Sequence, residues 1–283
     1  MYFEDIISTL QEFWKSHGCN IIPGCDVKVG AATSCHFTLL RCIENKPWNI
    51  CQTQFCRRPA DARFAQNPNR LGSYYQMQVI MRPIPENIQT LCIDSFASIG
   101  IDKKLHDFRF IEDNWENPSL GATGLGFEVW CDNMEILQYT YMQQIGGIKC
   151  QSIPVELTYG LERVAMYVQN VDNIFDIQWN KDLKYSDIHY KDTEIDFSRY
   201  YSEYKDDTEK LRSDFEYYLK NSELLIKNGI LIPAYEECLN ANHVFNVLDS
   251  RGVLSNNDRT AKILQIRGYV KMICEAWSLK YNN

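Results

Sequence analysis

Apolar residues recur at helical spacing in three segments of the first 180 residues. The first segment, residues 2–17, is followed by Gly18, where a left-handed helix end is expected. The second covers residues 84–105 and is predicted to end at Gly100, and the third covers residues 155–169. The first helix would bury a face made of Phe3, Ile6, Ile7, Leu10, Phe13 and Trp14.

Alternating apolar and polar residues predict strands between these helices. Residues 125–144 alternate most clearly and predict a hairpin, because the pair Asp132 and Asn133 suits its turn. These patterns indicate an α+β fold with a largely antiparallel sheet. The remaining predicted strands are a short one closed by Pro23, residues 49–55, residues 73–81 and residues 106–113.

The chain changes character near residue 180. Glycine becomes rare, tyrosine and charged residues increase, and only helix patterns follow. We therefore expect an α+β domain over residues 1–180 and a helical C-terminal domain over residues 181–283. The predicted helices of the second part are residues 197–228, 234–250 and 256–279, the last opened by a capping box of Ser255 and Asp258.

The charge balance limits the possible partners. Among 283 residues, 37 acidic and 29 basic side chains give a net charge of −8. A protein that binds nucleic acid unaided needs an excess of lysine and arginine on some face. If a nucleic acid is a substrate, another chain should supply most of the binding surface.

The cysteine positions favour a reducing compartment. The eleven cysteines include no pair with the two-residue gap of a zinc knuckle, and the odd count suits no disulfide framework. We expect them to be small buried apolar residues without a chemical role. The N-terminus has no secretion signal pattern and no segment is long enough to span a membrane, so the sequence predicts a cytoplasmic protein.

Several common catalytic motifs are missing from the sequence. It contains no Walker A loop and no Gly-x-Ser-x-Gly nucleophile elbow. The glycines between Gly121 and Gly126 precede a strand, which does not fit a dinucleotide-binding loop, and the five histidines show no metal-binding spacing.

A long loop between two predicted strands carries Arg57, Arg58, Arg63 and Arg70. Long ordered loops usually have a function, and guanidinium groups match phosphate oxygens in a bidentate manner. A solvated charged loop is the better interpretation of this feature taken alone.

The predicted hairpin carries a pair of carboxylates. Glu128 precedes Asp132 by four residues and Glu135 follows it by three, so they flank the turn and both could lie on one face, with Gln138 further along. Such a pair could hold Mg²⁺ bound to substrate phosphates. Ordinary surface charges are about equally probable from the spacing alone.

The third feature is the run Glu156-Leu-Thr-Tyr-Gly160-Leu-Glu162-Arg163. Gly160 would stand where a strand passes into a helix and would allow close backbone approach, and Arg163 would lie in the first turns of that helix. Glu162 and Arg163 would otherwise be an ordinary exposed helix pair. Three weak signals for a polyphosphate are stronger together.

In this order, the three features resemble motifs 2 and 3 of class II aminoacyl-tRNA synthetases. More closely, the sequence is similar to the family of α subunits of the bacterial heterotetrameric glycyl-tRNA synthetase, and the likeness runs from the first helix to the last. It is carried by the runs RRPADARFAQNPNRL, YYQMQV, FIEDNWENPSLGATGLGFEVW, QQIGG and ELTYGLERVAMY.

The resemblance implies a class II antiparallel catalytic sheet flanked by helices, with ATP and Mg²⁺ as cofactors. It implies an α–α homodimer through residues 1–25 and an assembly of two α and two β chains. The β subunit would carry most of the contact with tRNA(Gly), and residues 181–283 would contact the β subunit or the tRNA. The implied activity is glycine activation and transfer to tRNA.

The resemblance also assigns roles to individual residues. Arg57 or Arg58, preferably Arg57, would contact the α-phosphate, and Arg163 would cover adenine and reach the γ-phosphate. Tyr74 or Tyr75 would stack on adenine. Glu128 and Glu135 would hold Mg²⁺. Our own hypothesis for glycine is that Glu156, with Gln78, receives the ammonium and that Trp115 or Thr33 and Ser34 exclude larger amino acids.

Some features leave other functions open. Family members usually have Ala-Gly-Thr-Ser-His where this chain has Ala-Ala-Thr-Ser-Cys at 31–35, and an aromatic residue where it has Thr123. A core role for Trp115 is at least as probable as a pocket role. A non-catalytic synthetase-like binding protein, and a ligase that passes an aminoacyl-adenylate to another acceptor, are the alternatives.

Overall fold

The computed structural model describes residues 1–282. Its centre is an eight-stranded sheet of order β1-β2-β3-β8-β6-β5-β4, with β7 paired to β6. All neighbouring strands are antiparallel except β1 and β2, which are parallel. The strands are β1 (Asn20–Pro23), β2 (Ile50–Arg57), β3 (Ser73–Met81), β4 (Phe108–Asn117), β5 (Ala122–Cys131), β6 (Met134–Ile145), β7 (Ile148–Lys149) and β8 (Val155–Gly160).

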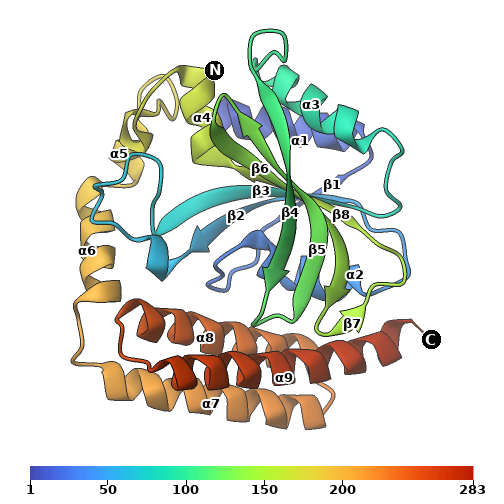
Figure 1. Cartoon of the computed structure of the whole chain (residues 1–283), viewed down its shortest axis with the longest axis vertical. Coiled ribbons are helices and arrows are strands. Elements are labelled where there is room, and N and C mark those ends of the chain that lie inside the picture. The colour runs from blue at the N-terminus through green and yellow to red at the C-terminus, as the bar shows by residue number, and fades with distance from the viewer. Residues whose placement is uncertain (283) are drawn as a thin grey trace.

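Helices cover both faces of this sheet. Figure 1 shows α1, α3 and α4 on one side and the layered pair α8 and α9, with α7, on the other. The α-helices are α1 (Phe3–Ser16), α2 (His36–Cys42), α3 (Ile88–Ser98), α4 (Leu161–Gln169), α5 (Tyr185–Ile188), α6 (Lys191–Ser202), α7 (Thr208–Lys227), α8 (Leu231–Ser250) and α9 (Asn256–Tyr281). Three short 3₁₀ turns are η1 (Ala32–Ser34), η2 (Pro59–Asp61) and η3 (Ile174–Asp176).

One face of the sheet is apolar and packs on α1, α3 and α4. The register aligns Met77, Tyr159 and Leu137 across three neighbouring strands, and all three are buried. Phe3, Ile6, Leu10 and Trp14 of α1 belong to the same apolar cluster. At roughly 25 cal/mol per Å², burial of such side chains contributes about 1.5–3 kcal/mol each and holds this layer together.

The opposite face of the sheet is polar along its centre. Gln52, Gln78, Thr158, Gln138 and Glu128 occupy one continuous line of paired positions across β2, β3, β8, β6 and β5. Paired residues on neighbouring strands point to the same side, so their side chains share a face. This alternation positions the candidate site.

The C-terminal helices close the outer part of the polar face with a second apolar cluster. That cluster joins Phe245 of α8 and Trp277 of α9 to Leu39 of α2 and Met142 of β6. The boundary near residue 180 remains a prediction, but the helices beyond it do not bury their apolar residues separately. No helix within residues 1–282 is long and apolar enough to cross a membrane.

The structure confirms the α+β fold and corrects two predicted helices. Residues 155–160 form β8, and the helix begins only at Leu161, because Val155, Leu157 and Tyr159 alternate toward the apolar face. The predicted helix over 197–228 is two helices, α6 and α7, with a break at residues 203–207.

Candidate functional site

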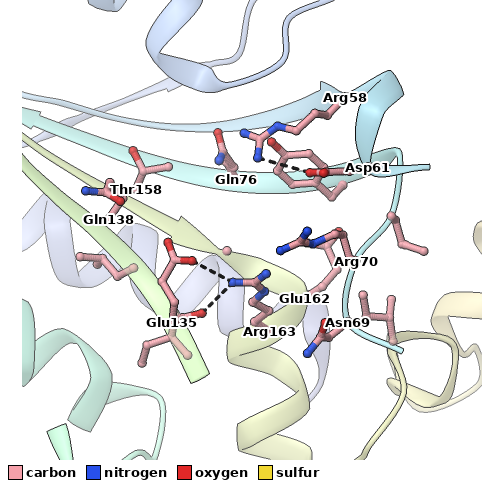
Figure 2. Close-up of a pocket in the computed structure, with 16 residues that line it drawn as sticks. Arg58, Asp61, Asn69, Arg70, Gln76, Glu135, Gln138, Thr158, Glu162 and Arg163 are labelled. Carbon is pink, nitrogen blue, oxygen red and sulfur yellow. Dashed lines mark hydrogen bonds and ion pairs between the residues drawn. The ribbon is translucent and has the colours of Figure 1, made fainter. Parts of the chain in front are cut away.

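A cavity opens on the polar face where the sheet meets the loop between β2 and β3. Figure 2 shows side chains from that loop, from β6 and β8, and from the first turn of α4 pointing into it. Cationic, anionic and amide groups therefore face one space. The lining residues are Arg58, Asp61, Asn69, Arg70, Leu71, Tyr74, Gln76, Glu135, Ile136, Leu137, Gln138, Thr158, Gly160, Glu162, Arg163 and Ile174.

The two adjacent arginines of the loop point to different places. Arg58 lines the cavity, and its Nη2 donates to the carbonyl oxygen of Gly30 at 3.1 Å. Arg57 lies in a separate pocket, where its Nη1 donates to Ser73 Oγ at 2.6 Å and its guanidinium carbon lies 4.5 Å from the ring centre of Phe197. The preference for Arg57 over Arg58 therefore disagrees with the geometry, because successive residues at a strand end face opposite sides.

The same alternation separates the two candidate tyrosines. Tyr74 lines the cavity, and its hydroxyl donates to Gly30 O at 2.7 Å. Tyr75 lies on the other face, in an aromatic group that includes Phe3 and His189, and its hydroxyl lies 3.0 Å from His189 Nε2. Only Tyr74 is placed to contact a ligand in this cavity.

Arg163 enters the cavity from the start of α4, directly after Gly160 ends β8. Its Nη1 donates to both the backbone oxygen and Oε2 of Glu135, each at 3.1 Å. Both side chains remain partly exposed, at 24% and 33%. The pair is therefore open to a charged ligand.

The two hairpin carboxylates share a face but not an environment. Glu135 pairs with Trp130 beside the turn, and a register shift between Val129 and Trp130 places Gln138 opposite Glu128. Glu135 lines the cavity, while Glu128 Oε2 accepts a hydrogen bond from Trp130 Nε1 at 2.9 Å and does not line it. Of the two carboxylates, only Glu135 therefore faces the cavity.

Another group of possible metal ligands lies outside the cavity. Among the described residues, ligand atoms of His106, Cys131 and Asp132 lie within 4.8 Å of one another at the hairpin turn. Asp132 also accepts a hydrogen bond from the backbone N–H of Asp107 at 2.8 Å, so it has a structural role in the turn. The histidine spacing in the sequence gave no sign of this group.

A buried carboxylate lies beside the cavity. Glu156 is 1% exposed, and its Oε1 accepts hydrogen bonds from Thr33 Oγ1 at 2.5 Å, from Thr158 Oγ1 at 3.1 Å and from Gln78 Nε2. Burial raises the pKa of Glu156, and these three donors oppose that effect. The polar row thus connects the cavity-lining Thr158 to a carboxylate beneath it.

Thr33, Ser34 and Trp115, which were also predicted to line the glycine site, lie in different surroundings. Thr33 joins the hydrogen-bond network, whereas the backbone oxygen of Ser34 accepts from Tyr235 of α8 at 2.7 Å. Trp115 packs against the second apolar cluster and does not line the cavity. Its placement favours the core interpretation.

The alternative in which Glu162 is an ordinary exposed helix residue does not hold, because Glu162 is buried at the edge of the cavity. It is 3% exposed, and its Oε1 accepts from the Tyr75 backbone N–H and the Tyr185 hydroxyl, each at 2.8 Å. Burial raises its pKa to about 7, and the two hydrogen bonds oppose the shift. No local pattern signals this burial, because Tyr185 is distant in sequence.

Sequence reasoning also missed Asp61, Asn69 and Gln76, which line the cavity. Gln76 could have been found, because it lies two residues before Gln78 on a strand and therefore shares its face. Asp61 and Asn69 depend on the path of the loop, for which the sequence carries no periodic signal.

Comparison with known proteins identifies the family. The family model described as "Glycyl-tRNA synthetase alpha subunit" matches residues 3–282. The chain belongs to this family. The glycine--tRNA ligase alpha subunit of Rickettsia bellii is 46% identical over 97% of this chain and 96% of its own length. The corresponding protein of Rickettsia prowazekii is 45% identical over the same shares.

A solved structure is also similar, but weakly. The pyrrolysyl tRNA synthetase of Desulfitobacterium hafniense shares 13% identity, covers 64% of this chain and 73% of its own, and gives a TM-score of 0.46. That likeness is too low to support an argument. The family assignment from the sequence is confirmed by the family model and the relatives. Membership of a synthetase α-subunit family implies ATP as a substrate and both a β chain and tRNA as partners.

The shifted pKa of Glu162 predicts a pH-dependent stability. The folded chain holds a proton on Glu162 up to about pH 7, whereas the reference pKa is 4.5. The stabilising effect of this proton is complete below pH 4.5 and is lost as the pH rises through 7. Glu162→Gln keeps an acceptor oxygen for both donors and cannot ionise. Its free energy of unfolding should therefore fall less from pH 5 to pH 8 than that of the wild type, by about 1–3 kcal/mol.

Urea unfolding at the two pH values measures this difference. The exposed Glu12→Gln is the control and should follow the wild type at both. Parallel curves for wild type and Glu162→Gln would show that Glu162 is already ionised in the folded chain at pH 5.

Proposed function

We propose that this chain is the catalytic α subunit of glycyl-tRNA synthetase. It activates glycine with ATP and, with a β chain, transfers glycine to the 3′ end of tRNA(Gly). The observation that carries the proposal is the cavity in which Arg58, Arg70 and Arg163 meet Glu135 on the polar face of the sheet. Three guanidinium groups around one cavity suit a triphosphate. We place this activity in the cytoplasm.

The first step is attack of a glycine carboxylate oxygen on the α-phosphorus of ATP. A bond forms between this oxygen and the α-phosphorus. The bond from the α-phosphorus to the oxygen that bridges to the β-phosphorus breaks, and pyrophosphate leaves. The carboxylate is ionised at neutral pH, so the step needs no general base. It needs alignment of the reactants and stabilisation of charge at the phosphate. In the second step, a terminal ribose hydroxyl of the tRNA attacks the glycyl carbonyl carbon and AMP leaves.

Arg58 is the residue that we assign to the α-phosphate. It lines the cavity and is held by Gly30 and by Asp61, whose Oδ2 lies 3.4 Å from its Nη1. Arg163 would exchange its contact with Glu135 for the γ-phosphate and cover adenine, and Tyr74 would provide an aromatic contact with the base. Arg57 has a structural role in this assignment, between β2 and α6.

Glycine recognition is assigned to the region around Thr158. The ammonium would interact with Thr158 and with the carboxyl group of Glu156 beneath it, which Gln78 and Thr33 orient. Thr140, opposite Glu156 on β6, has a buried hydroxyl oxygen without a hydrogen-bond partner in the described part of the chain. Exclusion of larger amino acids needs only rigid atoms in the path of a side chain, and the packed strands supply them.

Mg²⁺ fits the oxygen donors on this face. Glu135 lines the cavity, and Gln138 beside it and Glu128 opposite Gln138 add further oxygens. Hard divalent cations bind such groups together with substrate phosphates. The ion would neutralise phosphate charge when bound. Glu135 is then its principal protein ligand, and Glu128 a secondary one.

The partner surfaces follow from the sheet edge and the charge. β1 is the terminal strand of the sheet, and Ile21 on it is 37% exposed. An unpaired edge bearing an exposed apolar residue suits a second copy of the chain, with α1 alongside. We assign residues 181–283 to contact with the β chain or the tRNA, and most tRNA contact to the β chain because the net charge is −8.

The proposed reaction predicts ATP–pyrophosphate exchange that depends on glycine and not on a panel of other amino acids. Arg58→Ala should lower the exchange rate on the order of 10²–10³-fold, the effect of removing one oriented donor. Arg57→Ala is the matched control, with the same charge change one residue away, and should lower exchange far less. Thermal unfolding of both variants separates loss of fold from loss of catalysis.

The results have distinct meanings. Equal losses in the two variants would contradict the choice of Arg58. Absence of exchange in the wild type, with a β chain present, would favour the non-catalytic alternative, and exchange with another amino acid would favour a different ligase.

The Mg²⁺ assignment predicts unequal effects of the two hairpin residues. Glu135→Gln should raise the Mg²⁺ concentration at half-maximal exchange about 10-fold or more, because it removes a charged ligand. Glu128→Gln should raise it by a smaller factor. Mg²⁺ titration of exchange measures both, and an unchanged midpoint in Glu135→Gln would remove this residue from the metal site.

The dimer assignment predicts that the chain alone sediments as a dimer. Ile21→Asp should shift it toward monomer, because a buried unpaired charge at an interface costs several kcal/mol. Leu105→Asp, at an 80% exposed position, is the control and should leave the dimer intact. A monomeric wild type at micromolar concentration would rule out a stable α–α contact.

A further inference from the structure

Two cysteines lie in direct contact in the segment between β1 and α2. The sulfur atoms of Cys25 and Cys35 are 2.7 Å apart. Cys25 follows β1 and Cys35 follows η1, so the pair spans the segment that leads from the sheet edge to α2. A disulfide has a sulfur–sulfur bond of about 2.05 Å, and a small movement would bring the two atoms to that distance.

A single side chain holds both residues of the pair. Gln54 Oε1 accepts from the backbone N–H of Cys25 at 2.8 Å and from Cys35 Sγ at 3.1 Å. Gln54 Nε2 donates to the Cys25 backbone oxygen at 3.2 Å. Gln54 is 3% exposed and lies on a central part of β2, so it is a rigid anchor. The contact between the sulfurs is thus built into the fold.

The two thiols differ in access. Cys25 is partly exposed, whereas Cys35 and the other nine cysteines are buried. The hydrogen bond with Cys35 lowers the pKa of Cys25, and that same hydrogen bond raises the pKa of Cys35. Cys25 is therefore the thiol that an oxidant would meet first, and it has the greater thiolate character.

We propose that Cys25 and Cys35 form a reversible intramolecular disulfide under oxidising conditions. With a peroxide as the oxidant, the Cys25 thiolate attacks a peroxide oxygen and becomes a sulfenic acid, and the second oxygen leaves as water after protonation. The Cys35 thiol then attacks the sulfenic sulfur, the S–S bond forms, and the hydroxyl leaves as a second water. A dithiol reductant restores both thiols and is itself oxidised to its disulfide.

The site adjoins groups that shape the cavity. Between the two cysteines, Gly30 O accepts from Arg58 and Tyr74, and the Ala32 backbone N–H donates to Gln76 Oε1 at 2.9 Å. Oxidation would tie the ends of this segment together and remove the thiol hydrogen bond to Gln54. The proposal is independent of the proposed function, because it concerns the covalent state of the two sulfurs.

Peptide mapping tests the proposal on the intact chain. After treatment with hydrogen peroxide, free thiols are alkylated and the protein is digested with trypsin. Cleavage after Lys28 places the two cysteines in different peptides, residues 16–28 and 29–41. These two peptides should be recovered as one linked species that is lighter than their sum by two hydrogens, and dithiothreitol should separate them.

The variants identify the sulfurs. Cys25→Ser and Cys35→Ser should each abolish the linked species, and Cys19→Ser, which alters the other cysteine of peptide 16–28, should leave it unchanged. Far-ultraviolet circular dichroism confirms that each variant is folded. Failure of the wild type to give the linked species while other cysteines become oxidised would overturn the proposal, as would a link through Cys19 or between two chains.

Discussion

The site depends on strand alternation, which places Glu156, Gln52, Gln78 and Gln138 on the polar face of the central sheet. Glu156 is buried there. A buried polar group must be hydrogen-bonded, or it costs about 1–3 kcal/mol. Glu156 meets this requirement through Thr33, Thr158 and Gln78. Gln78 Oε1 in turn accepts from Thr38 at 2.5 Å and from Gln52 at 2.7 Å. The network fixes the segment carrying Thr33 to the sheet.

This network also explains why the C-terminal helices pack where they do. The polar centre of the face cannot be covered by an apolar helix without loss of its hydrogen bonds, so apolar contact is confined to the outer part. Tyr235 of α8 is fully buried and donates to Ser34 O at 2.7 Å, one residue from Thr33. The C-terminal helices thereby support the segment that holds Arg58, Tyr74 and Glu156 through hydrogen bonds, even though their own sequence carries none of the catalytic signals.

The periodic parts of the fold and of the site were predictable from the sequence. Helix α1, the hairpin of β5 and β6 and the α+β class follow from regular spacing, and Arg163 and Glu135 were both identified as site residues. The periodicity alone extended the helix back to residue 155, because the apolar residues of β8 run directly into those of α4, whereas the motif placed the strand-to-helix junction correctly at Gly160. Single-residue orientation was harder to predict. Which of Arg57 and Arg58 faces the cavity depends on the phase of a strand end, and the burial of Glu162 depends on a contact with Tyr185 that no local pattern encodes.

The charge distribution connects the site to the partners. An overall charge of −8 repels a polyanion, yet Arg58, Arg70 and Arg163 concentrate positive charge around one cavity. Screening limits the long-range repulsion to about 8–10 Å at physiological salt, so the cavity can still attract a small triphosphate. A tRNA presents many phosphates over a far larger surface, and the same acidic exterior disfavours it. The charge distribution therefore suits a small anion in the cavity better than a long polyanion on the exterior.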